Sequence, residues 1–536
     1  MKRLVAVLVA AVLAVSLASL TGLEGATASP GTVRTVASAY TPTITFAGCG
    51  DGTPDQCANF AVPLDYANPD TSAANTITLA VRMRPATATP NLGYMLANPG
   101  GPGASGTGLV ALAGNVPNNV GKQYSWIGFD PRGVGDSTPS LHCNTHYFGV
   151  NRPNYVPKTR ALMHFWKTKT RRYAAQCGAS AAARLLGHVS TMDTVRDMES
   201  LRVALSAPKI SFYGFSYGTY LGQAYATTYP GNVDKFVLDG VVNPVDYWYG
   251  ANLKQERGFD RNINIFFKWV ARHNHRYHLG TSGRAIRKGY NALLKRLDRH
   301  PLAHRRLGPD ELTDAMINAG YYVYNWDYIA ASYSALVRKG RAFAMFDIYR
   351  QLNMGDDNGY AMYLATQCTD VRRPSWHKQV LDAWRIHRKH PFLAWDNTWF
   401  NAPCVTWPAA SQSRIPISGA AAAAAGAKFL LVNETKDAAT PYSGALKVRS
   451  LFPSSALIAG VGGTTHAGSL SGVSCVDDRI ADFLANGTLP ARLAGTRSDV
   501  NCPKVPAPSS RYARTASGGV PPALRQQLFA GQLPRL

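Results

Sequence analysis

The chain has 536 residues, of which 46% are hydrophobic and 10% aromatic, so a mainly disordered protein is excluded and one large core with an insertion is possible. The formal charge of +24 suggests nucleic-acid binding, but fourteen Lys or Arg lie between positions 252 and 306, interleaved with apolar residues at helical spacing. A solvated helical face explains this pattern better than a polyanion-binding or cell-wall-binding surface, and we expect no nucleic-acid partner.

The amino-terminal segment has the pattern of an export signal. Two basic residues precede an apolar run at positions 4–20, and the small-residue sequence Ala26-Thr27-Ala28 follows it. We therefore predict a cleaved signal peptide at 1–28. A membrane anchor is the alternative, but the run is short for a bilayer span. The mature protein is expected to be secreted and monomeric, without stable membrane insertion.

The cysteines support an oxidising compartment. Their number, eight, is even, and none forms a C-x-x-C metal or redox motif. Four disulfides are therefore expected. Pairing each cysteine with its neighbour along the chain gives Cys49–Cys57, Cys143–Cys177, Cys368–Cys404 and Cys475–Cys502.

Strand-like and helix-like patterns alternate through the first half of the chain. After a flexible lead-in at 29–45, short apolar or β-branched runs alternate with helical patterns over 46–240. The runs that predict strands are TITLAVRM, GYMLANPGG, YSWIGFDPRG, KISFYGFS and KFVLDG, followed much later by KFLLVNETKD and SALIAGVGG. This alternation predicts an α/β fold with a mostly parallel, doubly wound sheet.

A long segment without a convincing strand separates the last two of these runs from the others. Residues 241–425 have helical periodicity and many Trp and Tyr, which predicts a large helical lid inserted between the sixth and seventh core strands. The second part of the core is then expected at 426–502, and a loop-like tail at 503–536.

The candidate nucleophile is Ser216. The sequence Gly214-Phe215-Ser216-Tyr217-Gly218 fits G-x-S-x-G, and it follows a predicted strand and precedes a helix-forming run. This context predicts the sharp turn of an α/β hydrolase, where glycines two positions on either side of the serine remove Cβ atoms that would collide.

A serine nucleophile needs a general base and an acid that orients it, in the chain order Ser, Asp or Glu, His. His466 is the only histidine beyond the last predicted strand, so it is the expected base. Asp437, after KFLLVNET and before Thr440-Pro441, is the expected acid. Glu434 and Asp239 are the alternatives, since both end predicted strands.

Acyl transfer also needs N–H donors for the developing oxyanion. One donor is expected to be the backbone N–H of Tyr217, directly after the nucleophile. The other is expected in the glycine-rich sequence at 98–103, from Gly101 or, as the alternative, Gly100. This acyl-enzyme chemistry needs no metal or organic cofactor, and none is expected. The glycine-rich segment lacks the Lys-Ser/Thr of a phosphate-binding loop, so no nucleotide is expected there.

Six segments together resemble the tripeptidyl-aminopeptidase-like and prolyl-aminopeptidase-like serine peptidases of the α/β-hydrolase superfamily. They are CANFAVPLDYANP (57–69), NPGGPGASG (98–106), GFDPRGVGDS (128–137), YGFSYGTYLG (213–222), FVLDGVVNP (236–244) and DAATP (437–441). The resemblance implies an exported exopeptidase that takes a free amino terminus. It also implies that Asp370, in a Cys-x-acid segment, holds the substrate ammonium; a turn-capping role beside a disulfide is the alternative.

These observations predict a secreted serine exopeptidase of the tripeptidyl- or prolyl-aminopeptidase type, whose partner is a peptide with a free amino terminus. A secreted carboxylesterase or lipase that uses the same Ser-Asp-His residues is the alternative. A third hypothesis, a cell-surface protein whose basic lid binds an anionic wall polymer, is disfavoured by the intact serine, aspartate and histidine.

Overall fold

The computed structural model describes residues 40–353 and 357–508. The predicted signal peptide, residues 29–39 of the lead-in and most of the tail lie outside the described residues. Within the described ranges, no helix is both long and apolar enough to cross a bilayer.

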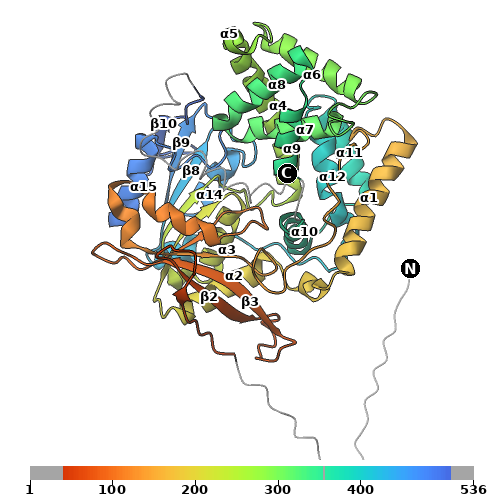
Figure 1. The fold of residues 1–536 in the computed structure, drawn as a ribbon. Coiled ribbons are helices and arrows are strands. Elements are labelled where there is room, and N and C mark those ends of the chain that lie inside the picture. Colours follow the sequence, from red (N-terminus) through yellow and green to blue (C-terminus); the bar gives the residue numbers. More distant parts are fainter. Residues whose placement is uncertain (1–39, 354–356, 509–536) are drawn as a thin grey trace, which may run out of the picture. The chain divides into compact units, whose positions relative to one another are not determined.

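In the described part of the chain, the core is a ten-stranded, mostly parallel sheet (Figure 1). Its spatial order is β1-β2-β3-β5-β4-β6-β7-β8-β9-β10. Antiparallel pairing is confined to the edge, where β2 pairs with β1 and β3, and β3 pairs with β5. The strands are β1 (Ala47–Gly48), β2 (Gln56–Pro63), β3 (Thr76–Arg84), β4 (Tyr94–Asn98), β5 (Ser125–Phe129), β6 (Ile210–Phe215), β7 (Val233–Asp239), β8 (Lys428–Glu434), β9 (Ser455–Val461) and β10 (Val500–Pro503).

Two hydrophobic clusters cover the two faces of the sheet, as the doubly wound prediction requires. Side chains alternate along a strand, so Met95 of β4 faces one cluster and Leu96 faces the other. The first cluster includes residues of η1 (Thr107–Gly114), η2 (Pro117–Gln123) and α15 (Ser474–Asn486). The second includes residues of α2 (Thr191–Ala204), α3 (Tyr217–Thr228) and α14 (Ser443–Leu451).

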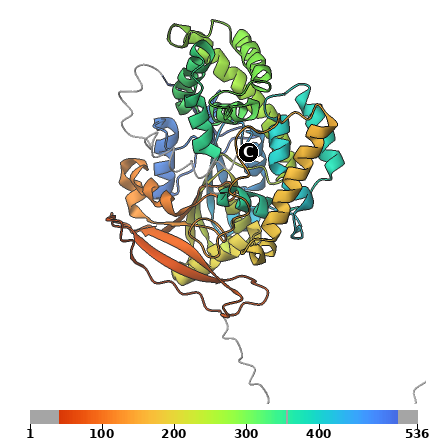
Figure 2. The ribbon, with the colours of Figure 1, turned by 45° about the vertical axis from the view of Figure 1, so that its right-hand side comes forward.

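The described residues between β7 and β8 form helices and add no strand to the sheet. All of these helices except the last, which contacts α3, gather on one side of the core in Figures 1 and 2. In chain order, the helices are α4 (Tyr249–Arg272), α5 (Asn274–Tyr277), α6 (Gly283–Leu297), α7 (Pro309–Tyr321), η5 (Val323–Asn325), α8 (Trp326–Lys339), α9 (Phe343–Asn353), α10 (Asn358–Asp370), α11 (Trp376–His387), α12 (Ala394–Asn401), η6 (Ala402–Thr406) and α13 (Ala420–Ala424).

The basic stretch follows the amphipathic pattern of two of these helices. In α6, Ile286 and Leu293 are buried, whereas Arg284, Lys288 and Arg296 are exposed. The helix packs on α4, which buries Phe266 and Trp269. The basic residues of α6 therefore lie mainly on its solvated face, as the sequence pattern predicts.

Helix α1 (Arg160–Gly178) lies against the inserted helices although it precedes them by far in the sequence. It contacts η6 and α12, and it lies beside α11 and α12 in both views (Figures 1 and 2). Trp166 of α1 stacks on Trp399 of α12 with ring centroids 6.0 Å apart. Helix α1 thus packs with the inserted helices, although the sequence analysis places its residues in the first part of the core, at 46–240.

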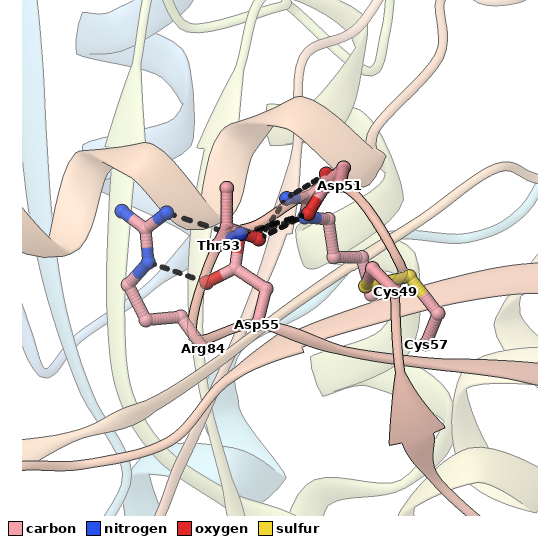
Figure 3. Close-up of a disulfide and its surroundings, with 7 residues drawn as sticks. Cys49, Asp51, Thr53, Asp55, Cys57 and Arg84 are labelled. Carbon is pink, nitrogen blue, oxygen red and sulfur yellow. Dashed lines mark hydrogen bonds and ion pairs between the residues drawn. A yellow bond between two sulfur atoms is a disulfide. The ribbon is translucent and has the colours of Figure 1, made fainter.

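The predicted pairing of the four disulfides is confirmed: Cys49–Cys57, Cys143–Cys177, Cys368–Cys404 and Cys475–Cys502. Figure 3 shows the first of them next to a loop of acidic and hydroxyl residues. Asp55 in that loop accepts hydrogen bonds at 2.7 Å from Arg82 and Arg84 of β3. The amino-terminal edge of the sheet is therefore held by both a covalent bond and ion pairs.

Two charged residues of the GFDPRGVGDS segment hold loops of the core together. The Arg132 guanidinium is buried and forms a bidentate pair with Asp197 of α2, at 2.5 and 2.8 Å. Asp130 accepts hydrogen bonds from Ser105 and Gly106, at 2.6 and 2.9 Å. Asp130 thereby fixes the loop after β4, which carries the predicted oxyanion donor.

Candidate active site

Ser216 lies at the sharp turn between β6 and α3. Its backbone has φ 54° and ψ −123°, and its N–H donates to the carbonyl oxygen of Asp239 at 2.9 Å. A Cβ on Gly214 would lie 2.6 Å from the carbonyl oxygen of Gly218, and a Cβ on Gly218 would lie 2.6 Å from the carbonyl oxygen of Asn98. Both glycines are therefore sterically required, and the strained turn matches the expected nucleophile position.

His466 and Asp437 meet in the loops that follow β9 and β8. The Nδ1 atom of His466 lies 2.8 Å from Oδ2 of Asp437, and both side chains are buried. The other carboxylate oxygen, Oδ1, accepts hydrogen bonds from the N–H groups of Ala439 and Thr440, at 2.9 and 3.0 Å. The backbone thus fixes the carboxylate, and the carboxylate orients the imidazole.

The inserted helices hold both of these loops. The N–H of His466 donates to the carbonyl oxygen of Tyr321, the last residue of α7, at 2.8 Å. Asn262 of α4 donates to the carbonyl oxygen of Lys436, directly before Asp437, at 2.9 Å. The position of the imidazole therefore depends on the insertion as well as on the sheet.

The two alternative acids, Asp239 and Glu434, anchor the histidine loop through backbone groups. Asp239 accepts from the N–H of Ser469 at 2.7 Å, and burial raises the pKa of Asp239 to about 6. Glu434 accepts from the N–H of Thr465, and burial raises the pKa of Glu434 to about 8. Asp437, whose carboxylate oxygen lies at hydrogen-bonding distance from the imidazole, is thus the acid whose place matches the expected role.

The glycine-rich loop after β4 lies directly against the serine turn. A Cβ on Gly100 would lie 2.9 Å from the Cβ of Ser216 and 3.0 Å from the N atom of Tyr217. The N–H of Gly100 already donates to Asn98 Oδ1 at 2.9 Å. In the described part of the chain, the N–H groups of Gly101 and Tyr217 have no protein acceptor. This arrangement favours Gly101 over Gly100 as the second oxyanion donor.

One cavity brings these groups together under the inserted helices. Gly101, Ser216, Tyr217 and His466 all line it. Further lining comes from α4 and the segment before it, from α10, and from aromatic side chains: Tyr247, Trp248, Asn252, Gln255, Tyr321, Tyr322, Tyr363 and Gln367. The cavity wall is thus rich in hydroxyl, amide and indole groups.

Asp370, the predicted ammonium ligand, lies behind this cavity and is not among the residues that line it. Its carboxylate accepts from the backbone N–H and the hydroxyl of Thr191, both at 2.6 Å, and from Tyr247 at 2.9 Å. Burial raises the pKa of Asp370 to about 7. Asp370 is linked to the cavity by its hydrogen bond with Tyr247, which lines the cavity. A contact between Asp370 and a substrate amine stays a prediction.

Comparison with known proteins gives the family. A family model described as the alpha/beta hydrolase fold matches residues 95–339, and one described as TAP-like protein matches residues 390–502. The chain is 35% identical to the tripeptidyl aminopeptidase of Streptomyces lividans, over 84% of this chain and 84% of the relative. The chain belongs to the tripeptidyl-aminopeptidase-like α/β hydrolases. It is therefore a serine hydrolase.

Two other relatives show how this family varies. Serine protease Hip1 of Mycobacterium tuberculosis is 29% identical, over 81% of this chain and 86% of the relative. Carboxylesterase B of the same organism is 31% identical, over 87% of this chain and 93% of the relative. Relatives of this chain thus include both a protease and a carboxylesterase. Family membership therefore establishes a serine hydrolase but does not identify its substrate.

Gly240 is a residue of the site that the sequence did not predict. It lies next to the imidazole of His466. Gly240 follows β7 with φ +69°, and a Cβ there would lie 2.9 Å from Cε1 of His466. Its sequence context, directly after a predicted strand, signals a turn and gives no sign of the histidine that lies against it. Gly240 therefore positions the base by leaving room for the imidazole.

We expect Gly240→Ala to lower kcat/KM about 10- to 100-fold, because the new methyl group displaces the imidazole from the serine. Gly340→Ala is the matched control: Gly340 has φ +64°, and among the described residues no atom lies within 4 Å of its added Cβ. Both variants should lose about 1–2 kcal/mol of stability from the left-handed backbone. Steady-state kinetics and thermal unfolding separate the two effects, and equal activity losses in both variants would contradict the positioning role.

Proposed function

We propose that this chain is a secreted serine exopeptidase that hydrolyses peptide bonds near a free amino terminus, as a tripeptidyl aminopeptidase does. The observation that carries this proposal is the buried hydrogen bond between His466 and Asp437 beside Ser216, at a polar cavity. The 35% identity to the Streptomyces lividans tripeptidyl aminopeptidase supports the peptide substrate.

In the proposed mechanism, Ser216 Oγ attacks the carbonyl carbon of the scissile peptide bond while His466 Nε2 takes the serine proton. Asp437 holds the proton of Nδ1 and stabilises the imidazolium that forms. The N–H groups of Tyr217 and Gly101 donate to the oxyanion. His466 then protonates the leaving amine, and the carbon–nitrogen bond breaks to leave an acyl-enzyme. Water attacks this ester, with His466 again as base, and releases the amino-terminal fragment and Ser216.

Among the carboxylates close to the cavity, Asp370 supports recognition of a cationic amino terminus, because Asp246 is already paired with Lys254. Asp246 lines the cavity and accepts from Asn243 at 2.6 Å and from Lys254. Asp370 holds Tyr247, which lines the same cavity. We propose that Asp370 places the Tyr247 hydroxyl, and through it the substrate amine, because both of its oxygens already accept hydrogen bonds.

The proposed site of action is outside the cell. The four disulfides are consistent with an extracellular protein. The predicted signal peptide at 1–28 supports secretion. Cleavage after Ala28 would be measured by amino-terminal sequencing of the exported protein.

A carboxylesterase is the second candidate function. The 31% identity to Carboxylesterase B over 87% of this chain supports it, and the same serine, histidine and aspartate would serve. An ester substrate differs in its leaving group, an alcohol that needs less help from His466 than an amine does. The two candidates therefore differ in which substrates are turned over.

Turnover of matched substrates distinguishes the two candidates. We expect Ala-Ala-Pro p-nitroanilide with a free amine to be cleaved at least about 100-fold faster than its N-acetyl form, because blocking the amine removes the group that fixes the scissile bond. p-Nitrophenyl butyrate serves as the ester. Turnover of the ester without turnover of either peptide would replace the peptidase by the carboxylesterase.

A further inference from the structure

Four side chains in the wall of the active-site cavity carry a buried polar atom that has no hydrogen-bond partner within the described ranges. These atoms are Trp248 Nε1, Asn252 Nδ2, Gln255 Oε1 and Gln367 Oε1. The four residues are at most 7% exposed. Buried polar atoms in native proteins are nearly always paired, so four unpaired atoms around one cavity indicate that a ligand supplies their partners.

Two helices that face the cavity bring these atoms together. Trp248 is the residue that precedes α4, and Gln255 lies seven positions later, on the same side of the helix. Gln367 lies on α10, one turn after Tyr363, which also lines the cavity. The amide of Gln255 is fixed, because its Nε2 donates to the carbonyl oxygen of Ala439 at 2.7 Å.

The combination of donor and acceptor atoms identifies the chemistry of the ligand. The indole N–H can only donate, so it needs a carbonyl or carboxylate oxygen. The two amide oxygens can only accept, so they need N–H or O–H groups. The main chain of a peptide offers both kinds of group a few ångströms apart. A hydrocarbon acyl chain offers neither and would leave these atoms unpaired at a cost in binding free energy.

Charge recognition does not explain these atoms. Asp246 is the acidic residue among those that line the cavity in the described chain, and it is already paired with Lys254. Trp248, Gln255 and Gln367 are neutral, so they would recognise hydrogen-bonding geometry whatever side chains the substrate carries. A site of this kind suits substrates that share a backbone and differ in side chains.

We infer that Trp248, Gln255 and Gln367 form a subsite that binds the main-chain N–H and C=O groups of the substrate's amino-terminal residues. The indole N–H donates to a substrate carbonyl oxygen, and the two amide oxygens accept from substrate N–H groups. This inference rests on the proposed peptidase function. It adds to that function the residues that select a peptide over an acyl chain.

The test compares Gln367→Leu with Gln379→Leu in the full-length mature protein. Gln379 is a matched control, because it is 3% exposed, has an amide without partners in the described residues, and does not line this cavity. The measured quantity is the ratio of kcat/KM for Ala-Ala-Pro p-nitroanilide to kcat/KM for p-nitrophenyl acetate, whose acyl group is too small to reach all three atoms. Because both rates come from one preparation, the ratio does not depend on the fraction of protein that is folded.

We expect this ratio to fall about tenfold or more in Gln367→Leu and to stay within twofold of the wild type in Gln379→Leu. Trp248→Phe, which removes only the N–H and keeps an aromatic ring, should also lower the ratio. An unchanged ratio in both Gln367→Leu and Trp248→Phe, or an equal fall in Gln379→Leu, overturns the subsite and leaves the peptidase standing. A wild-type protein that cleaves no peptide overturns the peptidase itself.

Discussion

Replacing Ser216 by alanine should lower kcat for peptide hydrolysis by about 10⁵- to 10⁶-fold while KM changes little. The substitution removes the only atom that can form the acyl-enzyme in the proposed mechanism, and it leaves the cavity, the oxyanion donors and the imidazole in place. The rate that remains should come from those groups acting on a bound water molecule. Steady-state turnover of the free-amine p-nitroanilide measures the loss, and covalent labelling by a fluorophosphonate should disappear with it.

The control for this substitution is Ser206→Ala. Ser206 has φ 51°, close to the φ 54° of Ser216, so both replacements place alanine at a positive φ. Ser206 lies in the turn after α2 and does not line the cavity. The Ser206→Ala variant should therefore keep wild-type turnover. If Ser216→Ala retained more than about 1% of the activity, the nucleophile would have to be another residue.

The serine turn could be predicted from the sequence because its determinants are local. The steric need for Gly214 and Gly218 arises within five residues and from the strand beside them, and the G-x-S-x-G pattern records that need directly. Asp437 and His466 could be predicted from chain order and from their places after strands. The distance between them could not be predicted, because it depends on Tyr321 and Asn262 in the inserted helices.

Strand prediction was weakest at the sheet edges. Seven strands, β3 to β9, coincide with predicted runs, whereas β1, β2 and β10 were missed. The sequence of β2, QCANFAVP, mixes polar and apolar residues because its burial changes along the strand, so it lacks the continuous apolar signal of a central parallel strand. Strand β10 has only four residues and is fixed by the Cys475–Cys502 disulfide as much as by its composition.

Contacts between distant segments were also beyond the reach of a single sequence. Nothing in the helical pattern of α1 indicates that Trp166 stacks on Trp399, more than two hundred positions away. The face of α4 that carries Trp248 and Gln255 has the spacing of a helix stripe, but that spacing does not say whether the stripe meets a protein core or a ligand cavity. The same limit applies to Gly240, whose neighbour His466 lies on another strand's loop.

Asp437→Asn should lower kcat by about 10⁴-fold without unfolding the protein. The N–H groups of Ala439 and Thr440 both donate to Oδ1, so the asparagine side chain keeps its oxygen there and turns its NH₂ group toward His466. An NH₂ group can only donate, and it therefore favours the tautomer of His466 that accepts at Nδ1 and carries its proton on Nε2. That tautomer cannot take the proton of Ser216, so the base is lost although its position is kept.

The two other buried acids provide the comparison for this prediction. Asp239→Asn keeps an oxygen that can accept from the N–H of Ser469, and Glu434→Gln keeps one that can accept from Thr465, so each should lower kcat by less than about tenfold. Thermal unfolding of all three variants reports any loss of stability separately from kcat. A 10⁴-fold loss in Asp239→Asn or Glu434→Gln, with a mild effect in Asp437→Asn, would move the role of orienting acid to that residue. The expected order instead follows from geometry, because Asp437 is the acid whose oxygen lies 2.8 Å from the imidazole Nδ1.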